Sequence, residues 1–327
     1  MTQTRATSLP VPLGLALALV AGAAMPAQGR INGQLGLFLG NGMQAATISF
    51  GTGLVIILAL AALLPSGRRG VRAIPAALRA KAFPWWYLCA GAIGAYFVLS
   101  QGLVVGILGI AVFTVANVTG QTVGSMVVDG TGFGPGGKRP ITGLRVIAAI
   151  IMLGAVLWAV SPQLGDAVAH PAELLLPMLL PFTAGILNGF QTAMNGTQTQ
   201  HYGTFVPATI FNFAVGFGVL AIALAVQAAV AGVAWNLPGE AWYYLGGACG
   251  VVFISLAAYL AKHLGVLLTS LGMIAGQLLG SLALDAVWPM GNDGVHLATV
   301  LGSVLAIGAV ALASVQPGAR LPWEKRD

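Results

Sequence analysis

The chain has 327 residues, of which 57% are hydrophobic and only 7% are charged, and its formal net charge is +6. A soluble domain carries about 25% charged residues, so this composition excludes a protein whose whole surface faces water. A bilayer span needs about 20 predominantly apolar residues, and the chain contains many uncharged stretches of this length. These features predict a polytopic membrane protein.

Only helices and closed barrels cross a bilayer, because lipid offers no water to bond with the backbone. Apolar runs such as 54–64 lack the alternation that barrel strands require. We therefore predict an all-α fold with about ten transmembrane helices. In chain order they lie near residues 11–30, 42–64, 85–105, 109–129, 142–160, 173–194, 206–229, 241–260, 265–287 and 295–315.

Three motifs occur twice, in the same order. They are Gln-x-x-x-Asn at 28–32 and 191–195, Ser/Asn-Phe-x-x-Gly at 49–53 and 212–216, and Gly-Gln-x-x-Gly-Ser-x-x-x-Asp at 120–129 and 276–285. The first two recur after 163 residues and the third after 156. A repeat of this length indicates two duplicated structural units rather than a solenoid.

We predict a first five-helix repeat over 9–160, a polar external linker over 161–173 and a second five-helix repeat over 174–317. Because five is an odd number, the second repeat enters the membrane from the opposite side. The two repeats are therefore predicted to be inverted relative to one another, as in many transporters.

The N-terminal segment has two interpretations. Arg5, an apolar run and the small residues around 24–27 resemble a cleavable signal peptide. However, the segment aligns with 174–195 in the middle of the chain, and cleavage would remove part of a duplicated unit. We expect it to be retained as the first span.

Basic residues predict the orientation, because cytoplasmic loops are enriched in Lys and Arg. If both termini are cytoplasmic, all but one of the 14 Lys and Arg fall on the cytoplasmic side, the exception being Arg30. These residues are Arg5, Arg68, Arg69, Arg72, Arg79, Lys81, Lys138, Arg139, Arg145, Lys262, Arg320, Lys325 and Arg326, whereas Asp166, Glu173, Glu240 and Asp293 lie outside. The segment 66–84 is then a positively charged cytoplasmic loop, and we expect no nucleic-acid partner.

No pattern in the sequence indicates catalysis, a metal or a cofactor, so we expect none of these. Cys89 and Cys249 lie in apolar spans, and the four His residues, at 170, 201, 263 and 296, lack the spacing of metal ligands. The glycine-rich segment 130–140 resembles a phosphate-binding loop. It has Arg139 where that loop needs Ser or Thr, and no strand precedes it.

Two stripes run along the fourth and ninth predicted helices. Polar residues spaced by four share one helix face, and these are Asn117, Gln121, Ser125 and Asp129, followed in the second copy by Gln277, Ser281 and Asp285. Beside them lie small residues that let another helix approach closely, of which we assign Gly120, Gly124, Gly276 and Gly280 to helix packing.

Amide side chains are the candidate solute ligands. The predicted translocation-path residues are Gln28, Asn32, Gln121, Gln191, Asn195 and Gln277. Two interpretations stay open: the amides form hydrogen bonds between helices, or they face a solute cavity. We expect the first, fourth, sixth and ninth spans to surround that cavity, with Gln121 facing Gln277. Inversion would place Gln28 and Asn32 toward the outside, and Gln191 and Asn195 toward the cytoplasm.

Arg30 is the one cation beside the first amide pair, and Ala193 takes its place in the second copy. It either extends to the external headgroups or faces an external vestibule, where it would favour anionic or zwitterionic solutes. No Asp, Glu, Lys or His lies in the middle of a predicted span. Proton-coupled transporters usually bury a carboxylate there, so the sequence gives no sign of such coupling.

The duplicated Gln-x-x-x-Asn and Phe-x-x-Gly motifs, with Gly120-Gln121 and Gly276-Gln277, resemble the YdcZ-type inner-membrane exporters of the drug/metabolite transporter (DMT, EamA-like) superfamily. Here two such units are fused, and the resemblance covers about 12–316. It implies ten helices in two inverted five-helix repeats around a central site, and an exporter function. The first span lacks the glutamate of small multidrug-resistance relatives, which argues against proton-coupled extrusion of organic cations.

The predicted function is therefore that of an inner-membrane transporter, an exporter of a small polar, zwitterionic or drug-like solute working by alternating access. Two other classes remain open: a non-transporting scaffold or sensor, and a membrane enzyme acting on lipids. The enzyme class would need acid–base, nucleophilic or metal groups at matched spacing, which the sequence lacks. We expect a lipid bilayer and an unidentified solute as partners, and a monomer, with a dimer left open.

Overall fold

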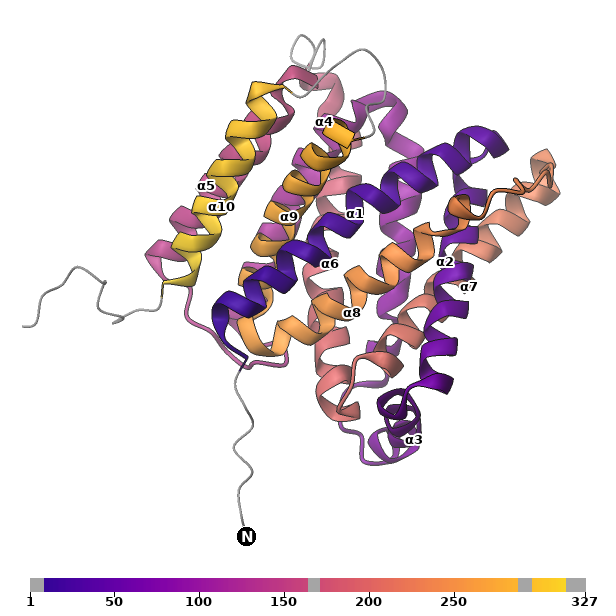
Figure 1. Ribbon diagram of the computed structural model, residues 1–327, viewed down its shortest axis with the longest axis horizontal. Coiled ribbons are helices and arrows are strands. Elements are labelled where there is room, and N and C mark those ends of the chain that lie inside the picture. Colours follow the sequence, from indigo (N-terminus) through magenta and orange to yellow (C-terminus); the bar gives the residue numbers. More distant parts are fainter. Residues whose placement is uncertain (1–8, 164–170, 288–295, 316–327) are drawn as a thin grey trace, which may run out of the picture.

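The computed structural model describes residues 9–163, 171–287 and 296–315, and within them all regular structure is helical (Figure 1). The α-helices are α1 (Val11–Leu39), α2 (Gly42–Leu63), α3 (Pro65–Arg79), α4 (Gly91–Thr131), α5 (Gly143–Val160), α6 (Pro171–Tyr202), α7 (Val206–Ala231), α8 (Gly246–Leu264), α9 (Val266–Val287) and α10 (Leu297–Ser314). Short 3-10 helices are η1 (Trp85–Ala90), η2 (Ser161–Gln163) and η4 (Ala241–Tyr244).

Within the described residues, seven helical segments are long and apolar enough to cross a membrane. They correspond to α1, α2, α5, α7, η4 with α8, α9 and α10. The remaining predicted spans, at 85–105, 109–129 and 173–194, fall on α4 and α6, which are not among the seven. The polytopic helical class is confirmed, while the count of ten spans and their inversion stay predictions.

Helix α4 is 41 residues long and folds back on itself. In a straight helix Phe97 and Phe113 would lie about 24 Å apart, at 1.5 Å per residue, yet their ring centroids are 5.6 Å apart. Similarly, Tyr96 bonds Thr183 while Gly120 packs on the neighbouring Phe182. Two arms of α4 therefore lie against the same stretch of α6, and their positions match the two predicted spans.

The basic segment 66–84, predicted as a loop, is largely helix α3. Its arginines Arg68, Arg69, Arg72 and Arg79 are exposed. Its buried side holds Gly67 against Ala61 of α2, and Gly70 against Thr204 and Pro207. The prediction missed this helix because it judged the segment by charge alone. Charge on one face and small residues on the other are typical of a helix lying on a protein surface.

Helix α1 ends nine residues beyond the predicted limit, at Leu39, so Gln28 and Asn32 lie within it. The turn that follows is well defined. Gly40 adopts the left-handed conformation with φ 64°, and Asn41 accepts a hydrogen bond from the Gln44 backbone N–H. Glycine at a helix C-terminus and asparagine at an N-cap both satisfy free backbone groups.

Helices of the first half pack mainly against helices of the second half. Helix α1 packs on α9 as α6 packs on α4, while α2 packs on α7 and α5 on α10 (Figure 1). At these helix contacts lie glycines at which an added Cβ would clash with the facing helix. Each such contact has an equivalent contact elsewhere in the molecule, related by the duplication. The pairs are Gly120–Phe182 with Gly276–Leu19, Gly124–Ile186 with Gly280–Ala23, Gly185–Asn117 with Gly22–Met273, and Gly53–Phe213 with Gly216–Phe50.

These pairs are related by the offsets of 163 and 156 residues that relate the sequence motifs. The rings of Phe50 and Phe213, which are equivalent residues, meet with centroids 5.5 Å apart where α2 crosses α7. The crossing of α2 and α7 therefore marks the centre of the pseudosymmetric arrangement. The predicted linker 161–173 is described only in part, as η2 and the first residues of α6.

Candidate functional site

The first amide cluster consists of Gln28, Asn32 and Ser49, on α1 and α2. The Gln28 Nε2 atom donates to Ser49 Oγ over 3.5 Å, the limit of a hydrogen bond. The Asn32 Oδ1 atom is buried without a partner among the described residues, and it lies where a side chain at Gly246 of α8 would stand. Gln28 and Asn32 are half-buried, and the glycine that follows each of them, Gly29 and Gly33, is exposed. This cluster is partly buried and weakly bonded.

The second amide cluster consists of Gln191, Asn195 and Asn212, on α6 and α7. The Gln191 Nε2 and Asn195 Nδ2 atoms both donate to Asn212 Oδ1, each over 2.9 Å. The three side chains are 5%, 2% and 1% exposed. One turn further along α6, Gln198 donates to the Tyr87 carbonyl over 2.8 Å. This cluster is closed, and its amides join helices.

Gln121 and Gln277 are not joined to each other by a hydrogen bond. Gln121, 5% exposed on α4, makes no side-chain hydrogen bond within the described part of the chain, and Gln277 of α9 is half-buried. Near Gln121, α4 and α9 are joined instead by the 2.8 Å bond between the Ser125 and Ser270 hydroxyls. Gln121 therefore does not act as a hydrogen-bonding link between helices in this structure.

The equivalent carboxylates Asp129 and Asp285 have different partners. Asp129 accepts hydrogen bonds from the backbone N–H groups of Val266 and Leu267, at 2.8 and 3.1 Å, and so caps the N-terminus of α9. Asp285 forms an ion pair with Arg30, whose guanidinium also donates to the Leu284 carbonyl. Both carboxylates tie distant parts of the chain together, at opposite ends of α9.

Arg139, in the segment between α4 and α5, completes the link made by Asp129. Its guanidinium donates to the carbonyl of Leu264 over 3.0 Å and to those of Lys262 and His263 over 3.2 Å each. It thereby satisfies carbonyls at the C-terminus of α8, which a cation stabilises. Burial lowers the pKa of Arg139, while the Asp129 carboxylate raises it. Arginine remains charged in proteins, so this clamp holds the α8–α9 turn.

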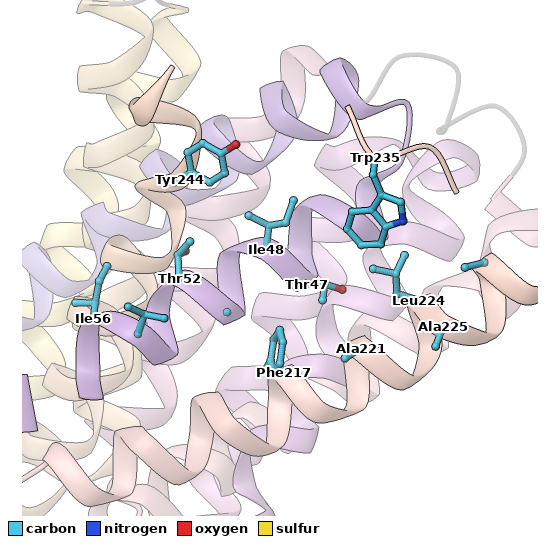
Figure 2. A pocket seen from close by; sticks show the side chains of 13 residues that line it. Thr47, Ile48, Thr52, Ile56, Phe217, Ala221, Leu224, Ala225, Trp235 and Tyr244 are labelled. Carbon is cyan, nitrogen blue, oxygen red and sulfur yellow. The ribbon is translucent and has the colours of Figure 1, made fainter. Parts of the chain in front are cut away.

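A cavity of about 730 Å³ lies between α2 and α7. Its lining includes Thr47 and Thr52 of α2, Phe217 and Ala225 of α7, and the aromatic Trp235. Figure 2 shows Trp235 at one end of the cavity and Ile56 at the other. None of the six predicted amides lines it, so the structure separates this space from the residues that the sequence singled out.

Comparison with known protein families identifies the family of the chain. A family model described as "Putative inner membrane exporter, YdcZ" matches residues 13–158 and 176–312. The chain belongs to the YdcZ family. The family model matches it twice, which agrees with a fused two-unit form. No curated protein matches the chain.

As a YdcZ-family protein, the chain is an inner-membrane transporter with several membrane-spanning helices, and its family is not an enzyme family. Among the described residues, no group of three His, Cys, Asp or Glu lies close enough to hold a metal. Some residues used for orientation lie outside the described residues: Arg5, Asp166, Asp293, Arg320, Lys325 and Arg326.

Sequence reasoning about this YdcZ-family chain missed three features. It identified Arg30 without its partner Asp285, although both lie within duplicated motifs. It placed Asp129 at a helix end without identifying the helix that it caps. It also treated Ser49 and Asn212 only as motif positions, although they are the acceptors of the two amide clusters. The exchange of Ser for Asn at equivalent positions was the available signal.

Proposed function

We propose that the protein exports a small polar, zwitterionic or drug-like organic solute across the inner membrane, by alternating access between its two repeats. The observation that carries this proposal is the exchange of helix contacts between halves, such as Gly120–Phe182 and Gly276–Leu19. Inverted repeats around a central site have two related packings, one open to each side.

The two amide clusters differ in burial and in hydrogen bonding. This difference is expected if the structure represents one of these two packings. The second cluster, on the predicted cytoplasmic side, is buried, and Asn212 accepts from both of its amides, while the Asn195 Oδ1 atom has no partner among the described residues. The first cluster, on the predicted external side, is half-buried and has one long hydrogen bond. In the opposite packing we expect these two environments to be exchanged.

Orientation is the first part of the proposal to test. The described basic residues of α3, the segment after α4 and the end of α8 lie at the end of the molecule where α1 begins (Figure 1). With that end cytoplasmic, alkaline phosphatase fused to the C-terminus will be inactive, because the enzyme works only outside. A fusion after Gly232, at the other end of α7, is the matched control and will be active. The reverse pattern overturns the orientation.

Export itself is tested by flux. Metabolite profiles of a deletion strain and an overexpressing strain first identify solutes whose intracellular level rises in the deletion strain and falls in the overexpressing strain. The purified full-length protein in proteoliposomes will then move such a solute faster than protein-free liposomes do. If no solute responds to expression and none moves in proteoliposomes, the protein is a scaffold or sensor and the proposal fails.

A further inference from the structure

We propose that the cavity between α2 and α7 is a binding site for an uncharged, apolar solute. The inference rests on the proposed export function and narrows its solute class, away from polar and zwitterionic molecules. A volume of about 730 Å³ lies within the roughly 300–1,000 Å³ of small-molecule sites.

The three hydroxyl groups of the lining already donate to backbone carbonyls, which leaves the indole N–H of Trp235 as the remaining side-chain donor. The Thr47 hydroxyl donates to the Met43 carbonyl over 2.8 Å, and the Thr52 hydroxyl donates to the Ser49 carbonyl over 3.0 Å. The Tyr244 hydroxyl donates to the Pro238 carbonyl over 2.7 Å. The remaining lining is aliphatic or aromatic, without a charged side chain. A polar solute would lose its hydration here and could recover few hydrogen bonds in return, which costs free energy.

A second, smaller cavity of about 440 Å³ lies on the other side of the α2–α7 crossing. Four of its lining residues, Leu58, Ala61, Ala62 and Ile210, are the 163-residue equivalents of Ala221, Leu224, Ala225 and Thr47 in the larger cavity. The two cavities are therefore one structural feature present twice, on opposite sides of the Phe50–Phe213 contact. A pair of this kind is what a solute path with two alternating openings requires.

The two cavities differ in what covers them. Helix α3 adds Arg68, Val71, Arg72 and Ile74 to the smaller cavity, whereas Trp235 and Tyr244 stand beside the larger one. Two arginines at the predicted cytoplasmic entrance disfavour cations. The uncharged lining on the far side offers no partner to an anion. An uncharged solute is the class that both cavities accept.

The test uses two fluorescent probes that share one ring system. N-phenyl-1-naphthylamine is uncharged, and 1-anilinonaphthalene-8-sulfonate adds a single sulfonate. Both are titrated into the full-length protein in nanodiscs, and binding is read as probe emission sensitised by protein tryptophan. We expect saturable binding of the uncharged probe, and binding of the sulfonate at least tenfold weaker. Equal or tighter binding of the sulfonate overturns the proposal.

Substitutions locate the site. Ala225→Phe fills the cavity and is expected to weaken binding of the uncharged probe tenfold or more. Ala229→Phe, on the same helix and outside the lining, is the matched control and should change it by less than twofold. If both variants bind as wild type does, the probe is dissolving in lipid or following acyl chains, and the proposal fails.

Further variants keep the test decisive if Ala225→Phe folds poorly. Trp235 is 60% exposed, so Trp235→Phe should leave the fold intact. Because it removes a tryptophan donor beside the bound probe, it should lower the sensitised emission more than the directly excited probe emission. Thr47→Val and Thr52→Val remove hydroxyls that already bond their own helix, and should change affinity by less than twofold. A tenfold loss in either would indicate polar recognition and refute an apolar site.

Flux measurements distinguish a failure of the proposed binding site from a failure of the proposed export function. Saturable probe binding without transport of any solute keeps the cavity as a binding site and refutes export. Transport of a solute that the uncharged probe does not inhibit keeps export and refutes the cavity as its site.

Discussion

In the second amide cluster, Asn212 accepts hydrogen bonds from both Gln191 and Asn195, whereas its equivalent in the first cluster, Ser49, accepts one long bond from Gln28. A carboxamide oxygen stands one bond further from the backbone than a hydroxyl oxygen does, so it can reach donors that a serine cannot. One residue difference at equivalent positions thus accompanies a buried, doubly bonded cluster in one half and a partly buried, weakly bonded cluster in the other. The duplicated amides therefore join α6 to α7 firmly in the second half and join α1 to α2 only weakly in the first.

The largest expected effect is on chemical accessibility. In a Cys89→Ala/Cys249→Ala background, we expect Asn32→Cys to react with a water-soluble maleimide at least tenfold faster than Asn195→Cys. The physical reason is that Asn32 is half-buried while Asn195 is 2% exposed. Labelling rates in intact cells and in inverted vesicles provide the measurement. Equal rates for the two cysteines would show that the first cluster is no more accessible to water than the second.

Removing the acceptor of each cluster sharpens the same comparison. Asn212→Leu deletes two hydrogen bonds and leaves two donors buried. At about 0.6 kcal/mol per membrane hydrogen bond and up to about 3 kcal/mol per unpaired buried group, we expect a loss of about 1–3 kcal/mol in unfolding free energy. Ser49→Ala removes one 3.5 Å contact and should cost less than about 0.5 kcal/mol.

Unfolding of the detergent-solubilised protein, followed by helical circular dichroism, measures both variants. A cost for Ser49→Ala equal to that for Asn212→Leu would mean that the first cluster is as firmly bonded as the second. The distinction between the two halves would then be lost.

The equivalent carboxylates extend the comparison to the ends of α9. Asp129→Ala removes two backbone hydrogen bonds at an N-cap, which typically costs about 1 kcal/mol. Asp285→Ala removes an ion pair whose two side chains are 13% and 38% exposed, and should cost about 0.5 kcal/mol or less because water screens it. Raising the salt concentration should reduce the effect of Asp285→Ala only. If the order of the two costs is reversed, Asp129 is not the stronger link.

The smallest effect on stability is expected at Gln121. Because its side chain has no hydrogen bond in the described part of the chain, Gln121→Leu should change the unfolding free energy by less than about 0.5 kcal/mol. If Gln121 contacts the solute, flux per molecule should nevertheless fall tenfold or more. Gln277→Leu is the matched variant. Wild-type flux in both would remove these residues from the translocation path.

The sequence alone predicted the membrane class, the family and most helix positions. Those features depend on local apolar length and on motifs, which are visible in one dimension. The duplication also predicted which glycines pack helices, and the structure places Gly120 against α6 and Gly276 against α1. Segment 66–84 was predicted incorrectly because its charge hid the small residues that pack α3 on α2 and α7.

The acceptors, the ion pairs and the cavities were decided by tertiary structure. Asp129 and Val266 are 137 residues apart, and Arg30 and Asp285 are 255 apart, so no local pattern links them. The cavity between α2 and α7 is invisible in sequence because apolar residues that line a space look the same as those that face lipid. Only the crossing at Phe50 and Phe213, with the small residues beside it, leaves that space between the two halves.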